Sequence, residues 1–143
     1  IQGLETVSLR MEKHCSNAAK VAEYLSKHNK VSRVIYAGLD EGKAGERANK
    51  YLKGGHGALC GIELKGGKAS GEKFINNLNM FYHVANIGDA RSLAIHPAST
   101  THSQLSDEDM ESAGVNPSYV RLSIGIEHID DIIEDLKNAL DAA

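Results

Sequence analysis

Two kinds of apolar periodicity alternate along the chain, and this alternation limits the fold more than any other feature. Apolar side chains recur at steps of three and four over about residues 4–28, which predicts one amphipathic helix. The same spacing returns from Ile129 to Leu140, where Asp130 and Asp131 occupy the first turn, a place where the helix dipole favours negative charge. Between these helices lie short β-branched and alternating runs. The chain must therefore pack helices against a sheet.

Five of these runs carry strand signals and are bounded by glycine-rich or charged turns. They cover residues 31–39, 58–64, 81–87, 92–95 and 119–126. Short helices are expected over 45–52, over 70–78 with Ser70 as its cap, and after Ser106, since Asp109 follows at capping-box spacing. We therefore expect an α+β domain with a partly antiparallel sheet of four to five strands and helices packed on one face.

Length and charge exclude several classes of protein. With 143 residues the chain fits one domain, and its formal charge of -3 lacks the positive field that nucleic-acid partners require. Its longest apolar stretches span only a few residues, so no membrane segment is expected. Cys15 and Cys60 are interpreted as small buried thiols of a protein in the reducing cytoplasm. Because the chain begins at Ile1 and enters a helix almost at once, we expect a piece of a longer protein.

The last predicted strand carries the first candidate site residue. Its alternation places Val120, Leu122, Ile124 and Ile126 on one face, and Tyr119, Arg121, Ser123 and Gly125 on the other. A guanidinium fixed on a strand matches a carboxylate with two parallel hydrogen bonds, so Arg121 is a candidate anchor for an amino or keto acid. A surface or interface ion pair is the alternative. We also expect the face of Tyr119, Arg121 and Ser123 to be exposed, with an apolar patch near the first helix.

Other polar clusters give weaker signals. Asn86 precedes a Gly-Asp turn, where backbone N–H groups could meet an anion, although the pattern taken alone favours a plain β-turn. His96 and His102 lack further ligands at recognisable spacing, so no metal site is predicted. The glycine-rich segment 54–57 lacks the Lys-Ser/Thr pair of a phosphate-binding loop.

Two long motifs near the end of the chain go beyond general patterns. They are residues 88–102 (Gly-Asp-Ala-Arg-Ser-Leu-Ala-Ile-His-Pro-Ala-Ser-Thr-Thr-His) and 120–127 (Val-Arg-Leu-Ser-Ile-Gly-Ile-Glu). Both closely resemble the C-terminal part of the Cys/Met-metabolism family of pyridoxal-phosphate enzymes. The opening segments 3–6 and 9–12, together with 85–89, resemble most the branch of this family that acts on O-acetylhomoserine.

The resemblance implies that residues 1–143 form the small C-terminal domain of a fold-type-I, aspartate-aminotransferase-like enzyme. The large domain, with the cofactor-linked lysine and the phosphate cradle, would lie outside this chain. Accordingly no catalytic and no cofactor-binding residue is expected here, and the chain alone should be inactive. By the same resemblance Arg121 binds the substrate α-carboxylate, Asn86 contributes to the same site, and Thr101 lies near the substrate pocket.

The implied parent reaction replaces the acetate of O-acetylhomoserine with sulfide to give homocysteine, in a homotetramer that requires pyridoxal phosphate. Methionine γ-lyase and the cystathionine-type lyases or synthases are alternatives within the family, and Ala85-Asn86 favours the sulfhydrylase over them. Outside the family, a stand-alone amino-acid-binding or dimerisation module and a purely structural α+β domain remain alternatives.

Overall fold

A computed structural model describes the backbone of residues 1–143 and all side chains except those of Asp107 and Glu111. Its sheet has five strands in the order β1-β2-β5-β4-β3. These strands are β1 (Val31–Ile35), β2 (Leu59–Leu64), β3 (Tyr82–His83), β4 (Leu93–Ile95) and β5 (Tyr119–Ser123). Every neighbouring pair is antiparallel except β3 and β4, which are parallel. The expected partly antiparallel sheet is confirmed.

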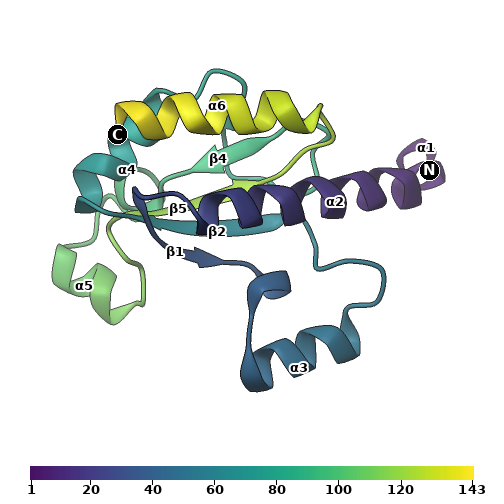
Figure 1. Cartoon of the computed structure of the whole chain (residues 1–143). Helices are drawn as coiled ribbons and strands as arrows, with labels where there is room; N and C mark the ends of the chain where they lie inside the picture. The colour runs from purple at the N-terminus through teal and green to yellow at the C-terminus, as the bar shows by residue number, and fades with distance from the viewer.

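The long helices gather on one face of this sheet (Figure 1). The helices are α1 (Gln2–Glu5), α2 (Val7–Ser26), α3 (Gly42–Tyr51), α4 (Gly67–Asn76), α5 (Asp107–Ser112) and α6 (Ile129–Ala142), with 3-10 turns η1 (Ala37–Leu39) and η2 (Pro97–Ser99). Helices α2, α4 and α6 lie over the sheet, whereas α3 stands away from it (Figure 1). None of the helices that the structure describes is long and apolar enough to cross a membrane.

The core lies between these helices and the sheet. Val120, Leu122 and Ile124 are fully buried, as the alternation in the last strand predicts. They pack with Leu25 of α2 and Leu136 of α6 in one apolar cluster. Removing this apolar surface from water is the main term that holds the helical layer on the sheet.

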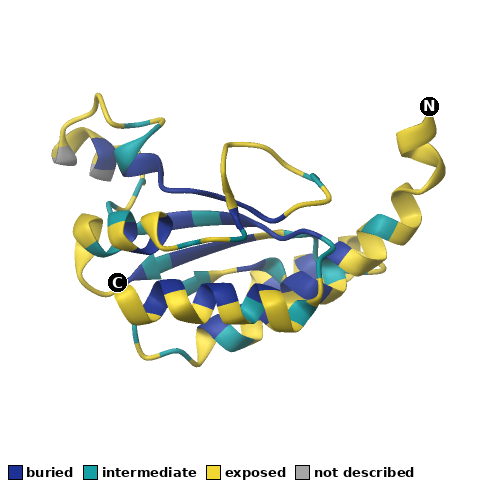
Figure 2. Cartoon of the chain, turned by 90° about the horizontal axis from the view of Figure 1, so that it is seen from above, coloured by how far each residue is buried: buried dark blue, intermediate teal, exposed yellow. Residues whose placement is uncertain are grey.

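The first helix differs from its prediction. The helix expected over 4–28 is interrupted at Thr6, which separates α1 from α2. Its apolar stripe also extends beyond the sheet, because Leu4, Val7 and Met11 are exposed while full burial begins at His14 (Figure 2). The predicted apolar patch near the first helix is therefore present. Periodicity alone does not show at which residue an apolar stripe stops packing against the sheet.

Two further local predictions have opposite outcomes. Helix α4 begins at Gly67 after Gly66 at φ 108°, so the prediction that Ser70 caps it is wrong. Gly66 adopts the left-handed backbone that glycine accepts without a steric penalty, and this turn starts the helix earlier. At α5 the predicted cap by Ser106 is confirmed, since its Oγ accepts from the Asp109 N–H at 3.2 Å and donates to Asp109 Oδ2 at 2.7 Å.

The two cysteines differ in burial. Cys60 is fully buried in β2, and burial raises the pKa of its thiol to about 12. Cys15 is only partly buried on α2. The prediction of a buried thiol is thus confirmed for Cys60 and wrong for Cys15, which lies at the turn of α2 where burial begins and is covered on one side by Gly55.

Candidate functional site

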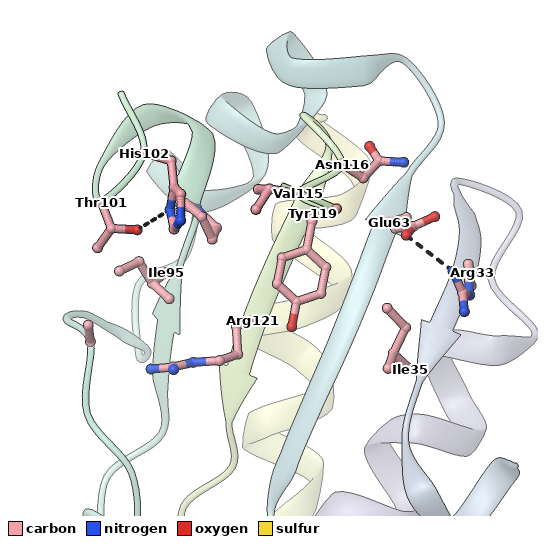
Figure 3. A pocket seen from close by; sticks show the side chains of 13 residues that line it. Arg33, Ile35, Glu63, Ile95, Thr101, His102, Val115, Asn116, Tyr119 and Arg121 are labelled. Atoms are coloured by element: carbon pink, nitrogen blue, oxygen red, sulfur yellow. Dashed lines mark hydrogen bonds and ion pairs between the residues drawn. The ribbon is translucent and has the colours of Figure 1, made fainter. Parts of the chain in front are cut away.

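Arg121 occupies the middle of the central strand β5, on the sheet face opposite the helices. Its register partners are Gly61 of β2 and Ile95 of β4. Directly opposed residues of antiparallel strands share a face, so Arg121 has an apolar neighbour on one side and no side chain on the other. Figure 3 shows its side chain extending away from Tyr119 on the side where Ile95 lies, and its Nη2 reaches the backbone of Asn86.

A cavity of about 390 Å³ opens on this face. Ile35, Ile95 and Val115 give it apolar walls, and Tyr119 and Arg121 form its floor (Figure 3). This mixture of apolar walls and few polar groups is typical of small-molecule sites. The expected exposure of the face is only partly confirmed, since Tyr119 and Arg121 are half-buried and Ser123 is buried. Ser123 is covered because it lies between Leu59 and Leu93 of the two adjacent strands.

The guanidinium of Arg121 keeps unused donors. Its Nη2 donates to the backbone carbonyl of Asn86 at 3.3 Å. Its Nε is buried and has no hydrogen-bond partner among the described residues. A buried donor without a partner is costly, so a ligand acceptor beside Nε would relieve a penalty as well as add a contact.

A second arginine near the cavity is already paired. Arg33 forms an ion pair with Glu63 at 3.6 Å, at the outer edge of the cavity (Figure 3). Within the described part of the chain, Arg121 has no such carboxylate partner. The cation available to an anionic ligand in this cavity is therefore Arg121.

Asn86 lies beside Arg121, but through its backbone. Its side-chain Oδ1 accepts from the Ile87 N–H at 2.8 Å and is thus engaged within its own loop. Its carbonyl oxygen receives Arg121 Nη2. The structure therefore brings these two predicted residues together, with Asn86 orienting the guanidinium.

Thr101 also lines the cavity, next to His102. Thr101 Oγ1 and His102 Nδ1 lie 2.8 Å apart, as the dashed line in Figure 3 marks. The two side chains form part of the cavity wall beside Ile95. A hydroxyl that shares a proton with an imidazole can offer a ligand either a donor or an acceptor.

His96 does not join this site. It is fully buried, with Nδ1 2.8 Å from Ser99 Oγ and Nε2 2.8 Å from the Pro117 carbonyl. Burial lowers the pKa of its imidazole. In the described part of the chain no three His, Cys, Asp or Glu residues are grouped to hold a metal ion. His96 therefore supports the loop after β4.

Sequence reasoning missed the contact between Gly61 and Tyr119. A Cβ atom on Gly61 would come within 2.5 Å of Tyr119 Cε2, so the tyrosine ring occupies the space that a side chain on Gly61 would fill. Burial of the ring raises the pKa of the Tyr119 hydroxyl. A glycine inside a predicted strand indicates such a close approach, and this signal was available at residues 58–64.

These features fit the carboxylate end of an amino acid. Arg121 can give two donors to a carboxylate, and the apolar walls exclude water that would weaken the pair. None of the described residues that line the cavity is a lysine. Arg121 is thus the group of this cavity that can bind a carboxylate.

Comparisons with known proteins agree with this architecture. A sequence model for Cys/Met metabolism PLP-dependent enzymes matches residues 1–141. The chain is 55% identical over 141 residues to an O-acetyl-L-homoserine sulfhydrylase of Leptospira meyeri, covering 98% of this chain and 32% of that protein. It is 45% identical to an L-methionine gamma-lyase of Fusobacterium nucleatum subsp. polymorphum, covering 99% of this chain and 35% of that protein.

A solved structure is similar as well. It is described as an O-acetylhomoserine (thiol)-lyase from Campylobacter jejuni and contains N'-pyridoxyl-lysine-5'-monophosphate. It superposes with a TM-score of 0.88 at 42% identity, over 98% of this chain and 33% of that chain. The chain thus spans about a third of the relatives that it matches. By its match over residues 1–141, this chain belongs to the Cys/Met metabolism family of PLP-dependent enzymes.

Proposed function

We propose that residues 1–143 are the small C-terminal domain of a longer PLP-dependent enzyme, in which Arg121 binds the α-carboxylate of the amino-acid substrate. The observation that carries this proposal is the guanidinium of Arg121, which faces the cavity with its buried Nε unpartnered. Asn86 orients that guanidinium, and Thr101 contributes to the wall on which the rest of the substrate rests.

The proposed reaction replaces the acetate of O-acetylhomoserine with sulfide. A carbon–sulfur bond forms at the γ carbon as the bond to the acetate oxygen breaks, and homocysteine and acetate leave. Pyridoxal phosphate supplies the electron sink for this chemistry when bound. The residues of this chain hold the carboxylate end, which fixes the orientation of the reacting bonds. A relative that is 50% identical, from Schizosaccharomyces pombe, is named homocysteine synthase, which supports this choice.

A methionine γ-lyase is the second candidate. The relative from Fusobacterium nucleatum favours it, since 45% identity lies close to the identities with sulfhydrylases. Both activities act on an amino acid with a free carboxylate, so the Arg121 site serves either one. Ala85-Asn86 beside that arginine is the feature of this chain that favours the sulfhydrylase.

We further propose a homotetramer located in the cytoplasm, whose large domain carries the cofactor lysine. Size-exclusion chromatography with light scattering of the full-length protein measures its mass directly. A mass of one or two subunits would contradict the tetramer. It would not bear on the proposed substrate, which the activity assay tests.

The deciding experiment uses the full-length protein loaded with pyridoxal phosphate. We expect homocysteine from O-acetylhomoserine and sulfide, and little breakdown of methionine alone. The reverse preference would identify a γ-lyase. Binding of amino acids without turnover of either substrate would favour the amino-acid-binding module. The chain of residues 1–143 alone should show no turnover.

A further inference from the structure

Glu127 connects the end of the central strand with the loop that contacts Arg121. Its Oε1 accepts from the Ser92 N–H at 2.6 Å, and its Oε2 accepts from the Ser92 hydroxyl at 2.9 Å. The same hydroxyl accepts from the Gly125 N–H at 2.9 Å. Ser92 is fully buried and Glu127 is half-buried, so the two bonds to the carboxylate are partly shielded from water. Hydrogen bonds to a carboxylate are stronger than those between neutral groups, and burial increases the difference.

The backbone of Glu127 is itself held firmly from the helical layer. Buried Asn17 of α2 donates through Nδ2 to the carbonyls of Gly125 at 3.1 Å and Glu127 at 2.9 Å. His14 Nδ1 lies 2.6 Å from the Ile124 carbonyl. Segment 124–127 is therefore tied to a helix of the core, and the carboxylate extends from a fixed position.

The loop on the other side has few anchors of its own. Asn86, Ile87, Ala90 and Arg91 are exposed. Among the described side chains, Asp89 accepts hydrogen bonds from Arg91 alone, at 3.0 Å from its N–H and 3.4 Å from its Nε. Beyond Ser92, segment 124–127 holds this loop through one backbone bond, from the Ile126 N–H to the Ala90 carbonyl at 2.9 Å. Arg91 also lies 4.2 Å above the Tyr82 ring.

Gly125 shows how closely the two segments meet. A Cβ atom at this position would lie 2.5 Å from both the Ala90 carbonyl oxygen and the Ser92 nitrogen. Backbone therefore packs directly on backbone here, and Glu127 closes the contact on its outer side. The loop that is fixed in this way carries Asn86, whose carbonyl holds Arg121 Nη2 at 3.3 Å.

We infer that Glu127 is a positioning residue for the carboxylate site, holding the 86–91 loop through Ser92 so that Asn86 keeps the Arg121 guanidinium aimed into the cavity. This inference rests on the proposed function of Arg121. Without the Glu127 carboxylate, the Arg121 guanidinium would still bind the substrate carboxylate, but it would spend less time in the productive orientation. The expected signature is weaker substrate binding with chemistry nearly unchanged.

The test compares Glu127→Ala, Glu127→Gln and Ser92→Ala in the full-length, cofactor-loaded protein, with Glu134→Ala as an exposed glutamate control on α6. For Glu127→Ala we expect the KM for O-acetylhomoserine to rise about tenfold while kcat stays within about threefold, the scale of losing the two part-buried hydrogen bonds to Ser92. Glu127→Gln keeps the acceptor for the Ser92 N–H and should recover most of the loss. Hydrogen exchange of a peptide covering residues 86–92 should accelerate about tenfold in Glu127→Ala.

Each result decides between alternatives. Unchanged exchange in the 86–92 peptide, or faster exchange with an unchanged KM, would overturn the role of Glu127. If Arg121→Ala weakens substrate use and Glu127→Ala does not, the carboxylate anchor stands and the positioning role is wrong. If Arg121→Ala is itself silent, the proposed function fails. Should Glu127→Ala not accumulate, Ser92→Ala carries the test, because it removes both hydrogen bonds of the Ser92 hydroxyl.

Discussion

Replacing Arg121 with alanine separates the role of this residue in binding from any role in folding. Among the residues whose side chains the structure describes, its guanidinium makes one hydrogen bond, to the Asn86 carbonyl at 3.3 Å. A long, half-exposed hydrogen bond of this kind contributes at most about 1 kcal/mol to stability. The substitution also removes a buried Nε that has no partner, which further limits the loss of stability. The free energy of unfolding should therefore change little.

The effect on substrate should be far larger. Losing one partner of a desolvated guanidinium–carboxylate pair costs about 2–5 kcal/mol. Because Arg121 is half-buried in this chain, we take the lower part of that range, about 2–4 kcal/mol. At about 1.4 kcal/mol per tenfold, kcat/KM should fall roughly thirty- to a thousandfold.

The assay is steady-state formation of homocysteine from O-acetylhomoserine by the full-length protein, with the absorbance of the bound cofactor as a check on occupancy. Arg121→Lys is the matched control, since it keeps the charge but not the planar pair of donors, and it should recover activity only in part. Arg33→Ala tests a guanidinium at the edge of the same cavity that is already paired with Glu63. An Arg121→Ala protein within threefold of the parent kcat/KM would refute the carboxylate anchor.

Three further substitutions test other parts of the structure. Gly61→Val should displace the Tyr119 ring, because a Cβ on residue 61 would lie 2.5 Å from it. We expect the KM for substrate to rise about tenfold in steady-state assays. An unchanged KM would show that the ring does not shape the cavity. The buried carboxylate of Asp135 accepts hydrogen bonds from the backbone N–H groups of residues 79, 80 and 81. Asp135→Asn should therefore lower the free energy of unfolding by about 1–3 kcal/mol in urea titrations. A loss below about 0.5 kcal/mol would contradict this. Burial lowers the pKa of His96 in the folded state, so the unfolded chain binds more protons. The stability of the fold should therefore decrease as the pH drops below the ordinary histidine pKa of about 6.5. In His96→Gln the decrease in Tm between about pH 7 and pH 5 should be smaller. Equal slopes for the two proteins would rule out His96 as the cause.

Local periodicity predicted where most elements of this fold lie, but it did not show the break at Thr6, and the strand expected over 81–87 covers Tyr82–His83. The strand around Arg121 has a clean two-residue alternation, and burial follows it at Val120, Leu122 and Ile124. The last helix was predicted within a residue of its start, because its acidic first turn and its apolar face agree. Such signals depend on neighbours within one turn or one strand, and the sequence displays them directly.

Asp135 marks the limit of this reasoning. It lies three residues after Ile132, on the apolar face of the last helix, where a buried carboxylate would be costly without donors. Its donors are the N–H groups of residues 79–81, more than fifty residues earlier in the chain. A polar residue inside an apolar stripe was thus a visible signal, but the identity of its partner was not.

The same reason explains why the sequence predicts Arg121 as an anchor more readily than it predicts the environment of Arg121. That residue 121 is an arginine is read from the sequence, and its face of the sheet follows from the alternation in one strand. Its neighbours follow from the strand order β1-β2-β5-β4-β3, which places residues 61 and 95 on either side of it. Strand order depends on pairings between segments separated by tens of residues, and the local periodicity of the sequence does not reveal these pairings. The Tyr119 ring therefore occupies the space over Gly61 that a side chain would fill, and this role of Gly61 becomes visible only when β2 is paired with β5.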